Sequence, residues 1–322
     1  MLRRRILIFY AIAVAIFLVT NKISPAPSPS FERNEYKPTG PTLNGYSSCV
    51  TNPYKDVINK SFDIIIEEVN DWLNFKHHGY AHILAEDPIY SRYDHKRFFP
   101  FEVNFMECTD LQCVGGECSG DLSKVACGMN YLSQVDDCVI YSIGGNNEWN
   151  FEKDLLKRTK CHIHTFDCTG PRGRFDVPKD ARLHFHHICL GASKSKGIGD
   201  DDPNCDYKHL CGDTLTLEDI QHQFGHTKID LLKLDIEGWE WPIFDIEYTN
   251  AIMPMELLME VHYNWNGNGG TRGVIHNQTM SSAKDMVRLQ SHLLGLGYVV
   301  VNRDDNPFCR HCTELTLVRV AC

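Results

Sequence analysis

The chain has 322 residues, of which 43% are hydrophobic, with 14 cysteines and a formal net charge of −10. This length is enough for one large domain with additions, or for two small domains. The acidic balance argues against nucleic acid as a partner, because phosphate binding needs basic patches.

The N-terminus has the pattern of a membrane anchor. Arg3, Arg4 and Arg5 precede an uncharged apolar run, which is typical of signal peptides and signal anchors. No A-x-A-like cleavage site follows, so we favour an uncleaved anchor at residues 6–20 with a cytosolic tail at 1–5. The sequence therefore predicts a single-pass type II protein held in the membrane of the Golgi or endoplasmic reticulum, with a secreted protein as the alternative.

Three further features agree with the secretory pathway. Residues 21–48 are rich in proline and serine and predict an unfolded stem, because they can bury little apolar surface. All the cysteines follow the anchor, and in an oxidising lumen most of them would pair. Asn59 and Asn277 begin glycosylation motifs, Asn-Lys-Ser and Asn-Gln-Thr.

Residues 49–130 are predicted to form an N-terminal extension, first helical and then rich in cysteine. Apolar residues recur at the helical period over 59–75. The cysteines that follow lack the paired C-x-x-C knuckles of a zinc site, so we favour disulfides over zinc. They are Cys108, Cys113, Cys118 and Cys127.

Strand and helix patterns alternate through the remainder, 131–322. This alternation predicts an α/β domain with a mostly parallel sheet and helices on both faces. A final pair of strands joined without a helix predicts an antiparallel feature at one edge. The expected strands are Cys138–Ile143, Cys161–Phe166, Leu183–Leu190, Ile229–Asp235, Met255–Val261, Tyr298–Val301 and Glu314–Val320, with helices at Asn147–Thr159, after a Thr216 cap, and after Ser281 or Ser282 up to Gly297.

Two acids mark the end of the fourth expected strand. Asp235 and Glu237 follow a buried apolar run and precede Gly238. Carboxylates are costly to bury unpaired, and ligands in open α/β sheets bind at the carboxyl ends of the strands. The pair therefore predicts a site, with an acidic strand-to-loop junction as the alternative.

The turn after the first expected strand points to the same edge. Gly144 and Gly145 let the backbone approach a ligand closely, and a helix N-terminus follows. Asp167 ends the next strand 23 residues after Gly144, where an acid is placed to hydrogen-bond ribose hydroxyls. The alternative for Asp167 is a turn residue or helix cap.

These motifs resemble a known family. The Ser-Ile-Gly-Gly-Asn turn, Thr-Phe-Asp at 165–167 and Leu-Lys-Leu-Asp-Ile-Glu-Gly-Trp-Glu at 232–240 look like class I S-adenosylmethionine-dependent methyltransferases. The closest likeness is to the FkbM-like branch with a type 22 methyltransferase domain, and it covers about residues 95–322. It implies a Rossmann-like sheet of seven strands with an antiparallel last strand, and S-adenosyl-L-methionine bound across strands one, two and four.

The resemblance also implies roles for single residues. Gly144, Gly145 and Asn146 would lie along the methionine and ribose, and Asp167 would hold the ribose hydroxyls. Asp235 would lie beneath the transferred methyl group.

One position of the predicted cofactor site departs from the class. Ser142 stands where most members carry an acid, and a hydroxyl cannot offer the methionine ammonium a carboxylate's charge. Either Asp235 or Glu148 takes over that role, or cofactor binding is weakened.

The predicted catalytic residues are Asp235, Glu237 and His262. The resemblance implies that Glu237 and His262 border the acceptor together with Glu260. His262 is the candidate general base, because an unperturbed imidazole titrates near neutrality; a structural histidine is the alternative.

No metal ligands are predicted. A zinc site among the histidines of the second and third strands is conceivable, but satisfied histidines are commoner. We expect a solvated loop at 200–202 rather than a divalent-cation site.

The sequence thus predicts O-methylation of an unidentified small-molecule, glycan or protein acceptor in the secretory pathway. A Golgi-type glycosyltransferase is one alternative, suggested by topology and the acidic loop. A non-catalytic luminal interaction protein with a methyltransferase fold is another, since Ser142 replaces an acid and the methyl donor is made in the cytosol.

Overall fold

The computed structural model describes residues 53–71, 101, 107–118, 123–244, 253–262, 283–306 and 312–321, without the side chains of 283–288. The predicted cytosolic tail, anchor, stem and Asn277 motif lie outside these residues. No helix within the described ranges is long and apolar enough to cross a membrane.

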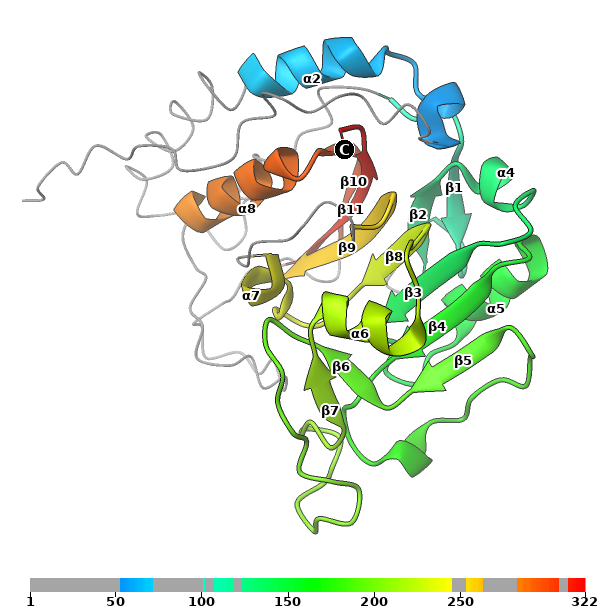
Figure 1. Cartoon of the computed structure of the whole chain (residues 1–322), viewed down its shortest axis with the longest axis vertical. Helices are drawn as coiled ribbons and strands as arrows, with labels where there is room; N and C mark the ends of the chain where they lie inside the picture. Colours follow the sequence, from blue (N-terminus) through cyan, green and yellow to red (C-terminus); the bar gives the residue numbers. More distant parts are fainter. Residues whose placement is uncertain are drawn as a thin grey trace, which may run out of the picture. The chain divides into compact units, whose positions relative to one another are not determined.

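A seven-stranded sheet organises the fold, in the order β10-β11-β9-β8-β3-β4-β5 (Figure 1). β11 runs antiparallel to both of its neighbours, and the other pairings are parallel. The predicted fold class, a Rossmann-like sheet with an antiparallel last strand, is therefore confirmed. The strands are β3 (Val139–Ile143), β4 (His162–Phe166), β5 (Leu183–His186), β8 (Leu231–Leu234), β9 (Glu256–His262), β10 (Tyr298–Asp305) and β11 (Cys312–Arg319).

Helices cover both faces of this sheet. Alternate residues of a strand point to opposite faces. Ile140 of β3 packs in one apolar cluster with Leu155 of α5 (Asn150–Arg158), whereas Tyr141 packs in another with Ile220 of α6 (Leu217–Phe224). The second cluster also receives α8 (Ala283–Gly295).

The predicted cap of α6 is confirmed. The amide of Asp219 donates to Thr216 Oγ1 at 3.2 Å, which satisfies a backbone group that the first helical turn leaves without a partner.

The third predicted strand is two strands. β5 stays in the main sheet, whereas β6 (Ile188–Leu190) pairs in parallel with β7 (Asp213–Leu215). Cys189 of β6 is bonded to Cys168, directly after β4. The strand pattern over 183–190 did not reveal this division, because the break depends on partners distant in sequence. α7 (Glu240–Phe244) was also not predicted.

The extension packs against the sheet. It contains η1 (Pro53–Val57), α2 (Phe62–Asp71), the antiparallel pair β1 (Leu111–Val114) and β2 (Lys124–Cys127), and α4 (Met129–Leu132). The buried face of α2 shares an apolar cluster with Val299 of β10 and Val318 of β11. The helix begins at Phe62 rather than at 59, and the domain division at 130, which falls inside α4, stays a prediction.

The preference for disulfides over zinc is confirmed. Cys108 pairs with Cys127 and Cys113 with Cys118 in the extension. Within the described residues, the other disulfides whose two cysteines are both placed are Cys138–Cys161, Cys168–Cys189 and Cys205–Cys211.

Candidate active site

The ends of β3, β4 and β8 bring three predicted site residues together. The amide of Gly144, after β3, donates to Phe166 O at 3.0 Å, and the amide of Asp235, after β8, donates to Ile143 O at 3.2 Å. Gly144 has a φ of 80°, and a Cβ there would lie 1.7 Å from Asp235 O. Only glycine tolerates both conditions, so the turn and the strand-four acid are packed backbone to backbone.

Asp167, after β4, is held by the chain itself. Its carboxylate accepts from the amide of Asn146 at 2.9 Å, and from the amide and hydroxyl of Thr169 at 2.9 and 2.6 Å. Arg174 lies 3.9 Å away, and the side chain of Asp167 is 5% exposed. The bond to Asn146 joins the two strand ends. Among the described residues, Oδ2 accepts only this one hydrogen bond, so a carboxylate acceptor site remains for a hydroxyl donor, and the predicted ribose role stays a prediction.

The carboxylate beside Ser142 is Glu152. Ser142 Oγ donates to Glu152 Oε1 at 2.6 Å, and both side chains are buried, whereas Glu148 is exposed. Burial raises the pKa of Glu152, against the lowering effects of the Ser142 hydrogen bond and Lys233. Asp235 and Glu148 were the two acids expected to compensate for Ser142, and neither of them lies beside it. Glu152 lies on the buried face of α5, which its spacing from Leu155 could have indicated.

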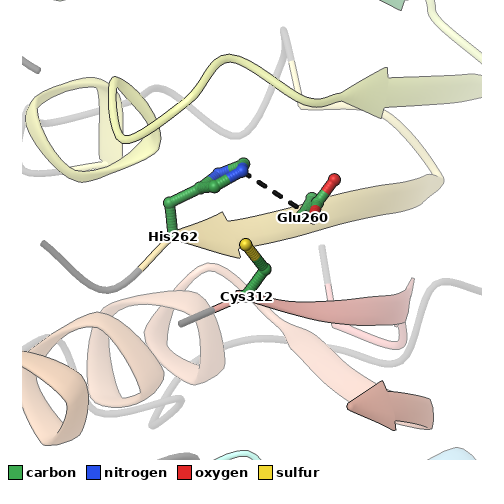
Figure 2. A group of neighbouring side chains, drawn as sticks. All are labelled: Glu260, His262 and Cys312. Atoms are coloured by element: carbon green, nitrogen blue, oxygen red, sulfur yellow. Dashed lines mark ion pairs between the residues drawn. The ribbon is translucent and has the colours of Figure 1, made fainter. Parts of the chain in front are cut away.

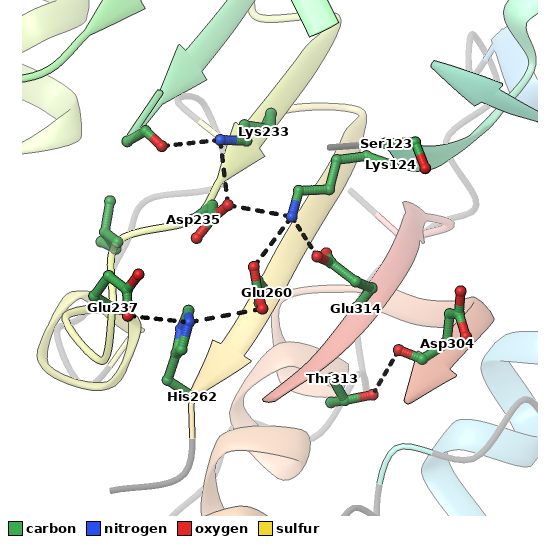
Figure 3. A network of polar contacts seen from close by, with 12 residues as sticks. Ser123, Lys124, Lys233, Asp235, Glu237, Glu260, His262, Asp304, Thr313 and Glu314 are labelled. Carbon is green, nitrogen blue, oxygen red and sulfur yellow. Dashed lines mark hydrogen bonds and ion pairs between the residues drawn. The ribbon is translucent and has the colours of Figure 1, made fainter. Parts of the chain in front are cut away.

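Asp235 is the centre of an ion-pair network (Figure 3). Its Oδ2 lies 3.2 Å from Lys124 Nζ and 3.5 Å from Lys233 Nζ. Lys233 also donates to Gly144 O at 3.1 Å. Burial opposes the ionisation of Asp235, but the charges of Lys233 and Lys124 prevail and hold its pKa well below the usual range. Asp235 is therefore a carboxylate at neutral pH.

Lys124 is a site residue that the sequence analysis missed. It comes from β2 of the extension, is 4% exposed, and pairs with Asp235, Glu260 at 3.1 Å, and Glu314. Burial would lower the pKa of Lys124, but the three carboxylates raise it. It lies 111 residues before Asp235 in the chain, and no local motif marks it.

His262, at the end of β9, is surrounded by carboxylates. Its Nδ1 lies 3.0 Å from Glu240 Oε1, and its Nε2 lies 3.6 Å from Glu237 and 3.7 Å from Glu260. Burial opposes its protonation, but Glu240, Glu260 and Asp235 raise the pKa of His262 to about 10. A protonated imidazole cannot accept a proton. Its predicted role as general base stays a prediction and requires a ligand that first neutralises these carboxylates.

Glu240 is a second missed residue. It is completely buried in α7, and besides His262 it accepts from the amide of Ile236 at 3.2 Å. Trp241 donates to His262 O at 2.7 Å. The sequence motif ends at Glu240, just before Trp241, and the orientation of both residues toward β9 depends on how α7 folds back.

Two groups of ligand-type side chains in the described part lie close enough to suggest a metal site, with ligand atoms within 4.8 Å of one another. The first is Glu260, His262 and Cys312 (Figure 2), but Cys312 is disulfide-bonded and offers no thiolate. The second is Asp235, Glu237 and His262, in which Asp235 already has two ammonium partners. We assign these side chains to the ion-pair network and name no metal ligand.

The histidines of β4 and β5 form neighbouring pairs. His162 Nδ1 lies 3.2 Å from His184 Nε2, and His164 Nδ1 lies 3.0 Å from His186 Nε2. They contribute to neither metal-type group found among the described residues. The acidic run at 200–202 lies in a surface loop, where Asp200 accepts from the amide of Arg172.

Comparison with known proteins places this chain among methyltransferases. A family model described as a methyltransferase domain, of type 22, matches residues 54–319. The chain is 27% identical over 143 residues to a probable methyltransferase-like protein 24 of Rattus norvegicus, covering 44% of this chain and 37% of that protein. It is 26% identical over 133 residues to a probable methyltransferase-like protein 24 of Homo sapiens, covering 40% and 34%. The chain thus spans about a third of the length of these curated relatives.

Among solved structures, a fibrillarin pre-rRNA processing protein of Methanococcus jannaschii matches with a TM-score of 0.35 and 10% identity, covering 57% of this chain and 67% of that one. Because the family model spans most of the sequence, the chain belongs to the methyltransferase domain family of type 22, whose members imply the use of S-adenosylmethionine.

Proposed function

We propose that this protein transfers a methyl group from S-adenosylmethionine to an oxygen of a small-molecule, glycan or protein acceptor. One observation carries the proposal: Gly144, Asp167 and Asp235 meet at one edge of the sheet and are linked through backbone and side-chain contacts. Convergence of a glycine turn with acids from the next strands is the arrangement that ligands use in open α/β sheets.

The residues at this edge fit the cofactor. Glu152 Oε2 is buried and makes no hydrogen bond, and it lies in the carboxyl group that accepts from Ser142. Gly145 lies close to this carboxyl group: a Cβ added at Gly145 would lie 4.0 Å from Glu152 Oε1, and its absence leaves space there. An unsatisfied buried acceptor under a glycine turn supports the binding of a cationic group there. Most members of the class carry an acid at the position of Ser142. Here Ser142 and Glu152 would together take the role of that acid in binding the methionine ammonium.

When bound, S-adenosylmethionine supplies an electrophilic methyl group, and the chain's task is to position the acceptor and receive its proton. Asp235 would remain ionised beneath the transferred methyl group. Of the residues on the acceptor side, Glu237 is 72% exposed and adjoins His262. With His262 protonated, Glu237 is the group that can receive the acceptor's proton, and the imidazolium would stabilise the developing negative oxygen.

We place the activity in the secretory pathway. The described disulfides suggest an oxidising compartment. An anchored luminal enzyme would need a supply of the methyl donor in that lumen, because the donor is made in the cytosol.

Binding of the cofactor is the direct test. Full-length protein made through a secretory host, with its disulfides formed, should bind S-adenosylmethionine and S-adenosylhomocysteine in isothermal titration calorimetry. A Cβ at Gly145 would come no closer than 3.6 Å to its neighbours, so Gly145→Val should fold. It should abolish binding, because the valine side chain would occupy the space that we propose for the ligand. Gly173→Val is the matched control, because a Cβ added at Gly173 would have no atom within 4 Å.

Turnover is then tested with cofactor carrying a labelled methyl group and extracts of secretory-pathway glycans, proteins and small molecules. Transfer of label that Gly145→Val abolishes supports the enzyme. Binding without any transfer favours the non-catalytic alternative, and absence of binding by the wild-type protein contradicts the proposal.

A further inference from the structure

We propose that Lys124 is a positioning residue of the methyl-transfer site, by which the disulfide-bonded extension holds Asp235 in place beside the glycine turn. The inference rests on the proposed function. It assigns to the extension a direct part in binding the cofactor, because the extension and not the sheet provides this ammonium group.

The position of Lys124 is fixed by its own strand. β2 pairs with β1 over Lys124–Cys127, and Cys127 is bonded to Cys108 before β1. The amide of Cys127 donates to Glu256 Oε1 at 2.6 Å, and the hydroxyl of Thr316 donates to Val125 O. These bonds tie both ends of β2 to β9 and β11, so its first residue points into the network at their carboxylates (Figure 3).

A continuous chain of contacts leads from Lys124 to the glycine turn. Lys124 Nζ pairs with Asp235 at 3.2 Å, and Asp235 pairs with Lys233 at 3.5 Å. Lys233 in turn donates to Gly144 O at 3.1 Å. Removing the ammonium group of Lys124 would leave Lys233 alone to neutralise Asp235. This would change the hydrogen bond by which Lys233 holds Gly144 in the glycine turn.

Carboxylates outnumber basic groups around Lys124, which gives this ammonium group its importance. Without it, Asp235 would keep Lys233 as its ammonium partner and stay ionised, but its carboxylate would lose the contact that ties it to β2. Lys124 faces Asp235 from the β8 end, Glu260 from β9 and Glu314 from β11. Asp235 is paired in turn with Lys233, and Glu260 with His262, which also faces Glu237 and Glu240.

The test measures the dissociation constant of S-adenosylmethionine near neutral pH for full-length wild-type protein, Lys124→Met and Lys124→Arg. We expect Lys124→Met to bind about tenfold more weakly, about 1.4 kcal/mol, because the lost ion pair no longer fixes Asp235 beside the glycine turn. Lys124→Arg should bind like wild type, since it keeps the charge.

A purely structural role predicts a different result. Lys124→Met within twofold of wild type, or Lys124→Arg that binds as weakly as Lys124→Met, would overturn the inference. Wild-type protein that does not bind S-adenosylmethionine at all would instead overturn the proposed function.

A second pair of variants decides the matter if Lys124→Met does not fold. Replacing Cys108 and Cys127 together by serine frees β2 while leaving every charge in place, and should weaken cofactor binding. Replacing Cys113 and Cys118 together by serine removes the other disulfide of the same extension and should leave binding unchanged. Equal binding by the two double variants would contradict the role of the extension.

Discussion

Two regions of this protein bury titratable side chains in opposite ways. At the ends of β8, β9 and β11, acids and bases of opposite charge meet, with Lys124 and Lys233 on either side of Asp235. On β4 and β5, His164 and His186 are neutral partners, 3.0 Å apart. Buried charge requires a charged partner, whereas a neutral imidazole requires only a hydrogen bond. The first region is therefore suited to binding charged ligands, and the second to packing.

The pKa values of the two regions move in opposite directions. In the histidine region, burial and the neighbouring His226 lower the pKa of His164 to about 3, and burial and His184 lower that of His186 to about 4. In the charged region, carboxylates overcome burial and raise the pKa of His262 to about 10. The same residue type is thus made a neutral side chain in one place and a cation in the other.

The largest expected effect comes from breaking the charged region. Asp235→Asn should lower the free energy of unfolding by about 3 kcal/mol, because it leaves buried ammonium groups without their shared carboxylate. Urea unfolding near neutral pH measures this change. Asp136→Asn is the control, since Asp136 is 80% exposed and pairs with Lys160 at the surface; it should change stability by less than about 0.5 kcal/mol. Similar small changes in both variants would show that the network contributes little.

The next effect is a loss of stability in alkali. A raised folded-state pKa gives His262 a stabilising contribution that is complete below the unfolded value, about 6.5, and is lost as the pH rises toward 10. Between about pH 6.5 and 9 the loss should be on the order of 2 kcal/mol. The unfolding free energy of wild type should therefore fall more steeply over this range than that of His262→Gln. Parallel curves for the two proteins would rule out a buried imidazolium.

The smallest effect is a loss of stability in acid from the histidine region. Depressed folded-state pKa values stabilise the protein fully above about pH 6.5, and this contribution is lost as the pH falls below it. His164→Leu should remove on the order of 1 kcal/mol of this loss between about pH 6.5 and 5. The exposed His222 supplies the control, His222→Gln, which should keep the wild-type slope. An unchanged slope in His164→Leu would mean that His164 is protonated with little cost in the folded protein.

Comparison of the two regions also shows where reasoning from the sequence succeeded. The histidines at 162, 164, 184 and 186 were expected to be satisfied on neighbouring strands, and alternation along strands was enough to place them side by side. In the charged region the sequence located Asp235, Glu237 and His262, because they follow apolar runs that become β8 and β9. It did not locate Lys124, Glu152 or Glu240, which come from a hairpin, a helix face and a short helix.

The sequence by itself determined the fold class, the antiparallel last strand that the family resemblance implies, and the edge at which the predicted site lies. These follow from periodicity, from short motifs and from the resemblance that the motifs carry, all of which are local properties of the chain. Tertiary structure alone decided which charges surround Asp235, which acid lies beside Ser142, and that His262 is a cation. Those features depend on side chains that approach from distant segments, and the electrostatic effect of a neighbour is set by its distance and burial rather than by its separation in sequence.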